Sequence, residues 1–344
     1  MHTRSHRREE LAKNAHGGTE AVNYRSVADL NDDIKAWAPT LPDIDLVVGI
    51  PRSGLLAGSI LALHLNAPLT DLDGFLEARA FATGERFEGD ANPQPERVLI
   101  LDDSVLSGSA MTDARDKIAA ASLPEETELL FGAVYVSPKG TALVDTYADV
   151  VTPPRVFEWN LMHHPGVVPK SCFDLDGVLC RDPTPRENDD GERYREFIST
   201  VEPLVVPSKP LGWIVTARLE KYREETEAWL EKHGIEYGEL IMLDLPDKET
   251  RQRLGNHGEF KAQVYSDLDA MLFVESNHGQ AMEIARLTDR PVYSVEHNQI
   301  IRQDRLTVLR RESQHHLRRF RANPVNFVRR AAAYLISQTG RLSL

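Results

Sequence analysis

Short apolar runs alternate with stretches of helical spacing along the first half of the chain. The runs lie at residues 46–50, 98–101 and 129–136, and each is separated from the next by a helical pattern. A short, continuous apolar run is typical of a strand that is buried on both faces, as in a parallel sheet covered by helices. We therefore predict an α/β domain with a doubly wound parallel sheet over residues 1–161.

A second series of the same kind follows a break in the pattern. Residues 162–170 contain two histidines, two prolines and a glycine without periodicity, which is typical of a linker. Beyond them the sequence predicts a second doubly wound domain over residues 171–301, followed by a helical tail over residues 302–344. The strands of this domain are expected at 171–173, 213–215, 240–243, 271–274 and 292–295, with a helix at 219–233.

Composition places the chain among soluble proteins. Of its 344 residues 41% are hydrophobic and 27% are charged, which excludes a disordered chain. No run approaches the 18 apolar residues of a membrane span, and the N-terminus lacks the apolar segment of a signal peptide. The two cysteines have neither disulfide nor zinc spacing, so we expect a reducing, cytoplasmic location.

The net charge of −13 is unevenly distributed. Ten arginines and two acids give residues 302–344 a charge of +8, which leaves −21 for residues 1–301. Nucleic-acid binding needs clustered Lys and Arg, so no nucleic-acid partner is expected for the acidic body. The basic tail has amphipathic helical spacing, which predicts contact with an anionic membrane, at the inner face of the cytoplasmic membrane. The alternative is a helix pair that docks on the acidic body or forms a dimer contact.

The first candidate site lies in V-L-I-L-D-D-S-V-L-S-G-S-A-M, residues 98–111, before a helical pattern. Ligands of open α/β sheets bind beyond the carboxyl ends of strands, and the free N–H groups of a helix start bind phosphate. Asp102 and Asp103 are therefore candidates for binding two vicinal hydroxyls or Mg²⁺. The alternative is an ordinary turn whose acids only cap the helix. The candidates for wrapping a phosphate are Ser107, Gly108 and Ser109.

A second glycine-containing turn follows an earlier strand, in L-V-V-G-I-P-R-S-G-L-L-A-G at residues 46–58. Together the two turns resemble the type I phosphoribosyltransferases, over residues 22–151. In that family an early loop binds pyrophosphate, and a later acid-acid-x-x-x-T-G-x-T loop binds ribose 5-phosphate. The resemblance implies phosphoribosyl pyrophosphate as donor, with Mg²⁺. It assigns Arg52, Ser53 and Gly54 to pyrophosphate, Asp102 and Asp103 to the ribose hydroxyls, and Ser107, Gly108 and Ser109 to the 5-phosphate.

Two positions depart from this family pattern. Purine-salvage members usually have an Asp directly before the Thr-Gly, where it hydrogen-bonds the base, and this chain has Leu106 there. Ala110 stands where a further phosphate-binding hydroxyl is common. The donor half of the site is thus present and the nucleobase half is not. We expect either an acceptor other than a purine or a regulatory domain.

The second candidate site opens in S-C-F-D-L-D-G-V-L-C, residues 171–180. Asp174 and Asp176 follow an apolar strand, where they are suited to hold Mg²⁺, one attacking a phosphorus atom while the other handles the proton. A calcium-binding EF-hand would need further ligands and a Glu at position twelve, and the sequence has neither. The pattern resembles the first motif of the haloacid dehalogenase superfamily.

Three further features appear in the order of that superfamily's motifs. Thr216 in G-W-I-V-T-A-R resembles the second motif, whose hydroxyl binds the transferred phosphoryl group. Lys261 resembles the third, a lysine that neutralises the aspartyl phosphate, with Lys248 as the alternative. Glu275 and Asn277 resemble the acidic fourth motif and would complete the magnesium site with Asp174 and Asp176. The segment between the first two motifs is short and polar, which predicts a minimal cap and an open pocket.

The two resemblances together predict a bifunctional enzyme. Its first domain would transfer 5-phosphoribosyl to an acceptor, for which Asp71, Asp73 and Glu77 are candidate bases, and its second would remove the 5-phosphate. The pairing resembles systems that build ribofuranose into bacterial surface polysaccharides, which implies a glycan or lipid-linked glycan acceptor and a β-ribofuranoside product. The alternatives are a nucleobase phosphoribosyltransferase fused to a nucleotidase, and a non-catalytic donor or nucleotide sensor that controls a phosphatase.

Overall fold

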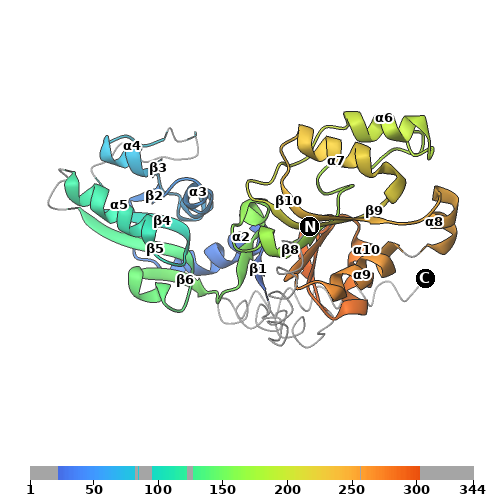
Figure 1. Ribbon diagram of the computed structural model, residues 1–344. Helices are drawn as coiled ribbons and strands as arrows, with labels where there is room; N and C mark the ends of the chain where they lie inside the picture. The colour runs from blue at the N-terminus through green and yellow to red at the C-terminus, as the bar shows by residue number, and fades with distance from the viewer. Residues whose placement is uncertain (1–21, 82–83, 85–94, 122–126, 256, 303–344) are drawn as a thin grey trace, which may run out of the picture. The chain divides into compact units, whose positions relative to one another are not determined.

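The computed structural model describes residues 22–81, 84, 95–121, 127–255 and 257–302. The predicted tail lies outside the described residues except for its first position. The described chain forms two compact units (Figure 1): unit A comprises residues 27–153, and unit B comprises residues 22–26 and 154–302. No helix of the described residues is long and apolar enough to cross a membrane.

Unit A contains a five-stranded parallel sheet with the strand order β3-β2-β4-β5-β6. The strands are β2 (Leu46–Gly49), β3 (Leu69–Asp71), β4 (Arg97–Val105), β5 (Glu128–Val136) and β6 (Thr146–Val150). The helices are α2 (Val27–Trp37), α3 (Ser53–Leu65), α4 (Leu72–Leu76) and α5 (Ser109–Ala120), with 3-10 turns η1 (Ala38–Thr40) and η2 (Gly140–Leu143).

Helices cover both faces of this sheet, as alternation along the strands requires. Leu46 and Val48 of β2 share a core cluster with Met111 and Ile118 of α5. Val47, which points to the other face, lies against α3, where a Cβ added to Gly58 would be 3.6 Å from its Cγ1. The doubly wound arrangement expected from the apolar runs is therefore confirmed.

Unit B contains a six-stranded sheet with the order β10-β9-β8-β11-β12-β13, parallel except for β13. The strands are β8 (Ser171–Phe173), β9 (Leu211–Leu219), β10 (Tyr237–Leu243), β11 (Leu272–Glu275), β12 (Val292–Ser294) and β13 (Gln299–Ile301). The helices are α6 (Glu192–Thr200), α7 (Arg223–Lys232), α8 (Lys248–Leu254), α9 (His257–Asp267) and α10 (His278–Thr288), with 3-10 turns η3 (Glu158–His163), η4 (Val168–Lys170) and η5 (Glu220–Tyr222).

The two faces of this sheet bury separate cores. Phe173 and Val274 pack with α6 and α7, through side chains such as Phe197 and Trp229. Their neighbours in sequence, Cys172 and Phe273, point to the opposite face. There they pack with Ala262 and Tyr265 of α9 and with Ala281 and Ile284 of α10. Both units are thus α/β with helices on each side of a largely parallel sheet.

The boundary between the units differs from the predicted one. The structure divides the chain at 153/154 instead of at residue 161, and it places residues 22–26 with unit B. There β1 (Asn23–Arg25) pairs in parallel with β7 (Arg155–Phe157). Residues 162–170 are no free linker, because Val167 and Val168 are buried in the same core cluster as Tyr24. Proline, glycine and histidine break the periodicity here, but these buried valines hold the segment on unit B.

Candidate active sites

The two candidate loops of unit A meet at the carboxyl edge of its sheet. Strands β2 and β4 are neighbours, so the turns that follow them, which lead into α3 and α5, lie at adjacent strand ends. The Ser53 hydroxyl, in the first turn of α3, donates a hydrogen bond of 2.8 Å to Oδ1 of Asp103. A residue assigned to pyrophosphate and a residue assigned to the ribose thus contact one another across 50 positions of sequence.

The paired acids are more enclosed than a strand end would suggest. Asp102 and Asp103 are only 8% and 3% exposed, and β4 continues through both of them to Val105. The backbone N–H of Asp103 donates to Oδ1 of Asp102 at 2.8 Å. The N-cap position of α5 is occupied by Gly108, so neither acid stands where a simple helix cap would.

Gly54 allows α3 to approach β4 closely. A Cβ at this position would lie 2.7 Å from the carbonyl oxygen of Leu101 and 3.3 Å from Oδ1 of Asp102. No side chain fits there without displacing the backbone. The preceding residue, Arg52, is exposed and joined to Pro51 by a cis peptide bond. The turn thus presents a cation at the edge where the acids lie.

The predicted phosphate loop opens α5. Gly108 is the residue before the helix and has a φ of 81°, a left-handed conformation that favours glycine. A Cβ there would also lie 2.5 Å from Cδ1 of Leu143. Ser107 and Ser109 are exposed, with their hydroxyl oxygens 3.4 Å apart. Two hydroxyls and the free N–H groups of a helix start are a suitable set of donors for a phosphate.

The surroundings of this loop are apolar. Leu106 is 54% exposed and Leu143 is 38% exposed.

The three candidate bases have other contacts. Asp71 accepts a hydrogen bond from the Gly74 backbone as the cap of α4. Asp73 lies 3.6 Å from Lys117, and Glu77 pairs with Arg79 at 3.0 Å.

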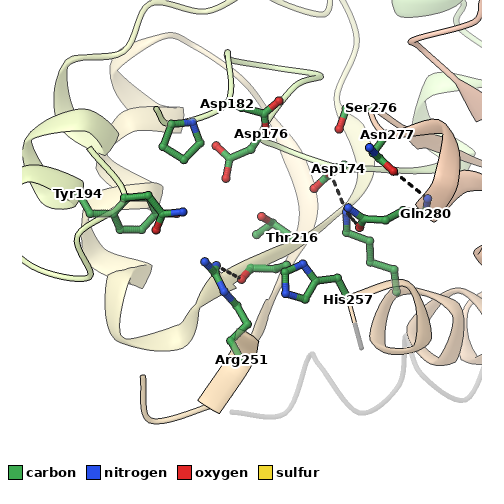
Figure 2. A pocket seen from close by; sticks show the side chains of 14 residues that line it. Asp174, Asp176, Asp182, Tyr194, Thr216, Arg251, His257, Ser276, Asn277 and Gln280 are labelled. Carbon is green, nitrogen blue, oxygen red and sulfur yellow. Dashed lines mark hydrogen bonds and ion pairs between the residues drawn. The ribbon is translucent and has the colours of Figure 1, made fainter. Parts of the chain in front are cut away.

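The candidate residues of unit B converge on one pocket (Figure 2). Asp174 follows β8, Thr216 lies in the adjacent β9, and Lys261 comes from α9. The pocket has a volume of about 220 Å³. It is lined by Asp174, Asp176, Asp182, Pro183, Asn188, Tyr194, Thr216, Ala217, Arg251, His257, Lys261, Ser276, Asn277 and Gln280.

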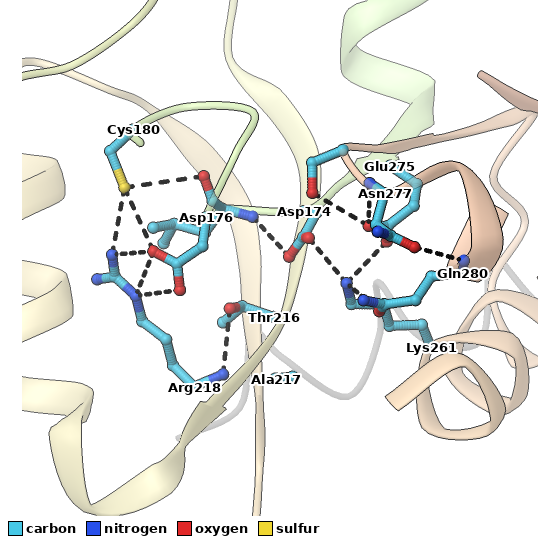
Figure 3. A network of polar contacts seen from close by, with 12 residues as sticks. Asp174, Asp176, Cys180, Thr216, Ala217, Arg218, Lys261, Glu275, Asn277 and Gln280 are labelled. Carbon is cyan, nitrogen blue, oxygen red and sulfur yellow. Dashed lines mark hydrogen bonds and ion pairs between the residues drawn. The ribbon is translucent and has the colours of Figure 1, made fainter. Parts of the chain in front are cut away.

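Lys261 is the centre of a buried polar network (Figure 3). Its ammonium donates to Oδ2 of Asp174 at 2.8 Å, to Oε2 of Glu275 at 2.7 Å and to Oε1 of Gln280 at 3.2 Å. It is 2% exposed. Lys248, the alternative, instead contacts the backbone oxygen of Asn188. The structure therefore brings Lys261, not Lys248, to the first aspartate.

Burial dominates the electrostatics of Asp174. It raises the pKa of this carboxyl to about 8, which the charge of Lys261 opposes and the nearby Glu275 reinforces. One Lys261 ammonium between two acids leaves the cluster one negative charge in excess when both are ionised. A further cation bound in the pocket would favour the ionised form of Asp174 and so oppose the effect of burial.

Asp176 is held by an arginine that the sequence interpretation did not single out. Arg218 is 1% exposed, and its Nη2 donates to Oδ1 of Asp176 at 2.6 Å, with Nε at 3.1 Å from Oδ2. The Cys180 thiol also donates to Oδ1 of Asp176, at 3.4 Å. The backbone N–H of Arg218 donates to the Thr216 hydroxyl at 3.2 Å, so that one strand end orders both side chains. In the sequence, Arg218 was indicated only by its place at the end of the motif G-W-I-V-T-A-R.

The two residues from the fourth motif have different surroundings. Both carboxylate oxygens of Glu275 are occupied, one by Lys261 and the other by the Asn277 backbone N–H at 3.1 Å. The Asn277 side chain lines the pocket while its Oδ1 accepts from the Gln280 backbone at 3.0 Å, as the cap of α10. Glu275 therefore orients Lys261, and Asn277 is the nearer of the two to any ion in the pocket.

Asp182 is a further acid in the pocket that the sequence did not indicate. Burial raises its pKa, and so do the charges of Asp176 and Glu275. Within the described residues no group of three or more His, Cys, Asp and Glu side chains is already arranged to hold a metal ion. The donor chemistry still suits Mg²⁺, since crowded carboxylate and amide oxygens face one cavity with an excess of negative charge.

Neither a protein-family model nor a curated protein matches the sequence. Among solved structures, a purine phosphoribosyltransferase from Pyrococcus horikoshii is 21% identical with a TM-score of 0.29, over 40% of this chain and 92% of that one. A xanthine-guanine-hypoxanthine phosphoribosyltransferase from Helicobacter pylori is 12% identical with a TM-score of 0.32, over 41% and 93%. An orotate phosphoribosyltransferase from Aeropyrum pernix is 18% identical with a TM-score of 0.25, over 35% and 68%. The functional argument therefore depends on the site residues.

Proposed function

We propose that the protein is a bifunctional enzyme that transfers 5-phosphoribosyl from phosphoribosyl pyrophosphate to a hydroxyl acceptor and then removes the 5-phosphate. The observation that carries the first half is the meeting of Ser53 with Asp103 at the edge of unit A. The contact of Lys261 with Asp174 carries the second half. The two sites belong to different units, so each activity has its own set of residues.

In the transfer step, the acceptor oxygen attacks C1 of the ribose and the bond from C1 to the pyrophosphate oxygen breaks. Positive charge develops on the ring, so the donor must be held firmly while its leaving group is stabilised. Asp102 and Asp103 bind the ring hydroxyls, and Ser107 to Ser109 bind the 5-phosphate. Arg52 and Ser53 receive the departing pyrophosphate. The acceptor proton passes to a base, and inversion at C1 gives a β-ribofuranoside.

In the hydrolytic step, an oxygen of Asp174 attacks the phosphorus and the bond to the sugar O5 breaks. Asp176 donates the proton that O5 needs, and Thr216 and Lys261 stabilise the phosphoryl oxygens. Water then attacks the aspartyl phosphate, Asp176 takes its proton, and phosphate leaves with the Asp174 carboxylate restored. The ester and one water become an alcohol and inorganic phosphate. Loss of the 5-phosphate makes the transfer irreversible.

Both halves of the proposed reaction would use magnesium. In unit B, Asp174, Asp176 and Asn277 would hold it, with Asp182 at its border. In unit A, Asp102 and Asp103 would hold it against the donor. At either site the ion supplies screening of the phosphate charge.

The acceptor we favour is a glycan or lipid-linked glycan. Exposed Leu106 and Leu143 beside the phosphate loop support this choice, because they offer no hydrogen bonds to a purine edge. The basic tail, whose residues lie outside the described part, would bring the enzyme to the inner face of an anionic membrane where such acceptors are found. A nucleobase acceptor is the alternative.

Two substitutions test the proposal. We expect Asp103→Asn to abolish pyrophosphate release and to spare hydrolysis of an added phosphate monoester. Asp174→Asn is expected to retain transfer and to accumulate a 5-phosphorylated product, whose acceptor mass spectrometry would identify. Pyrophosphate release that needs a free purine or pyrimidine would favour the nucleobase alternative. Tight donor binding without release on any acceptor would support a sensor.

A further inference from the structure

Arg251 is a pocket-lining cation that no acid of the described residues neutralises. Its Nη1 donates to the backbone oxygen of Ala217 at 3.0 Å, while its Nε is buried without a hydrogen-bond partner. The other two cations of the site are held by acids, Lys261 by Asp174 and Arg218 by Asp176. Arg251 therefore keeps donor capacity for a ligand.

This guanidinium lies on the side of the pocket away from the fourth motif. In Figure 2, Arg251 and Tyr194 are opposite Asn277 and Gln280, with Thr216 between them. Asp174 and Lys261 mark the place at which the phosphoryl group would be transferred. The side of the pocket that carries Arg251 therefore faces the alcohol that is released from the phosphate.

His257 adds a second polar group to the same wall. Burial lowers its pKa, and the charges of Arg251 and then Lys261 lower it further. The imidazole is therefore neutral near pH 7, with one nitrogen that donates and one that accepts. Hydroxyl groups also both donate and accept, so an imidazole of this kind matches them.

The wall is fixed in place by a partly buried link between two segments. The Asp190 carboxylate accepts from the Lys248 backbone N–H at 3.0 Å and from the Tyr222 hydroxyl at 2.8 Å. It also pairs with Lys221 at 2.9 Å. The Lys248 ammonium contacts the backbone oxygen of Asn188, which lines the pocket. These contacts join the start of α8 to the loop of Asn188, so the wall is preorganised.

From these contacts we infer that Arg251, His257 and Asn188 form a subsite for the ring hydroxyls of a sugar phosphate, beside the ring of Tyr194. The inference rests on the phosphatase proposed for unit B and names its substrate class. The cavity of about 220 Å³ is smaller than the roughly 300–1,000 Å³ that encloses drug-sized ligands. It therefore encloses the phosphate and one sugar ring, while the rest of a glycan stays outside.

The test compares two esters on the full-length protein with Mg²⁺. Methyl β-ribofuranoside 5-phosphate carries the ring hydroxyls, and p-nitrophenyl phosphate lacks them. Arg251→Ala is expected to lower kcat/KM for the sugar ester by about tenfold to a hundredfold, the effect of one lost charged hydrogen bond. Its effect on the aryl ester is expected to be at least about tenfold smaller. Arg251→Lys restores only part of the loss, because an ammonium lacks the guanidinium fork.

Arg253→Ala is the matched control, because Arg253 is an exposed arginine of the same helix. It is expected to leave both esters unaffected, and thermal unfolding would show that both variants fold. An equal loss on the two esters would place Arg251 at the phosphoryl group and overturn the subsite, as would no loss on either. Hydrolysis of neither ester by the unaltered protein would instead overturn the phosphatase itself.

Discussion

The residues with the largest electrostatic consequences lie in the buried cluster of Asp174, Lys261 and Glu275. These side chains are 5%, 2% and 0% exposed, so water screens their charges little. Such an arrangement is poor for stability when its acids are ionised, because two carboxylates then share one ammonium. It would suit catalysis, because the same ammonium lies beside Asp174, where the negative charge of a phosphoryl group would arrive.

The pH dependence of stability follows from Asp174. Its pKa in the folded protein, about 8, is above the ordinary 3.8, so the folded state favours the protonated form. The stability it contributes is full below pH 4 or so and is lost as the pH rises towards 8. In metal-free buffer the melting temperature should fall with pH over this range, and Asp174→Asn should flatten the decline. Asp244→Asn, which alters an exposed acid, serves as control; equal slopes for all three proteins would contradict the assignment.

Removal of Lys261 should leave two acids buried without a counter-charge. We expect Lys261→Met to lower the free energy of unfolding by about 3–5 kcal/mol, the usual cost of breaking a buried pair. Adding Glu275→Gln removes one of the stranded charges and should recover part of that loss, while activity stays absent. Urea unfolding measures both effects. A double variant no more stable than the single one would show that packing, not charge, is responsible.

The positions of candidate site residues could be predicted from the sequence where a motif fixes both the type and the order of side chains. Lys261 is an example, since its assignment followed from its place after Thr216. Arg218, Asp182 and Arg251 could not be predicted in this way. Their contacts arise because the fold brings together residues that are far apart in the sequence. Arg218 and Asp176, for example, are 42 positions apart. A buried arginine and an exposed one look alike in a sequence.

At the scale of elements, the donor site depends on how closely α3 packs on β4. A methyl group at Gly54 would meet the Leu101 carbonyl at 2.7 Å, and this backbone has little freedom to move. At Gly58, on the same helix, the nearest atom is the flexible end of Leu69, at 3.1 Å. The two glycines thus form a matched pair for testing whether the closeness of the elements matters.

We expect Gly54→Ala to displace the start of α3, to separate Ser53 from Asp103 and to reduce pyrophosphate release at least about a hundredfold, as misplacement of about 1 Å can. Gly58→Ala should retain most of the activity. Phosphatase activity measured on the same samples reports whether unit B is unaffected. A similar loss in both variants would indicate general damage to the helix instead of a local effect on the site.

Elements with a long apolar run were predicted well, and those without one were not. The run at 46–50 contains β2, and the run at 129–136 lies within β5. By contrast β1 and β7 have three residues each and no periodicity. Their pairing, Tyr24 with Val156, joins positions far apart in the sequence, which no local pattern records.

At the scale of the whole molecule, unit A is an insertion within unit B. The chain leaves unit B after β1 and returns at β7, which is the partner of β1. The Asn23 backbone N–H donates to the Pro154 oxygen at 2.7 Å, so the two crossing points are only a few residues apart along neighbouring strands. Each unit also has its own sheet and its own core clusters.

Excision of unit A should therefore leave a foldable phosphatase. Ser26 and Pro154 are about four strand residues apart along neighbouring parallel strands, or roughly 14 Å, which a flexible linker of about six Gly and Ser residues spans. We expect the product to hydrolyse a phosphate monoester within about threefold of the full chain and to release no pyrophosphate. Circular dichroism and the two assays check this. An unfolded product would show that unit B needs the insert.

Because β1 and β7 are far apart in the sequence, the ribosome also synthesises these two paired strands at different times. A ribosome delivers Tyr24 long before Val156, so the first strand of unit B must wait without its neighbour while all of unit A emerges. The inserted unit is complete by residue 153 and is free to fold during translation, as N-terminal domains generally do. Unit B would thus mature last, because its first strand is synthesised before all of unit A and its other strands only afterwards.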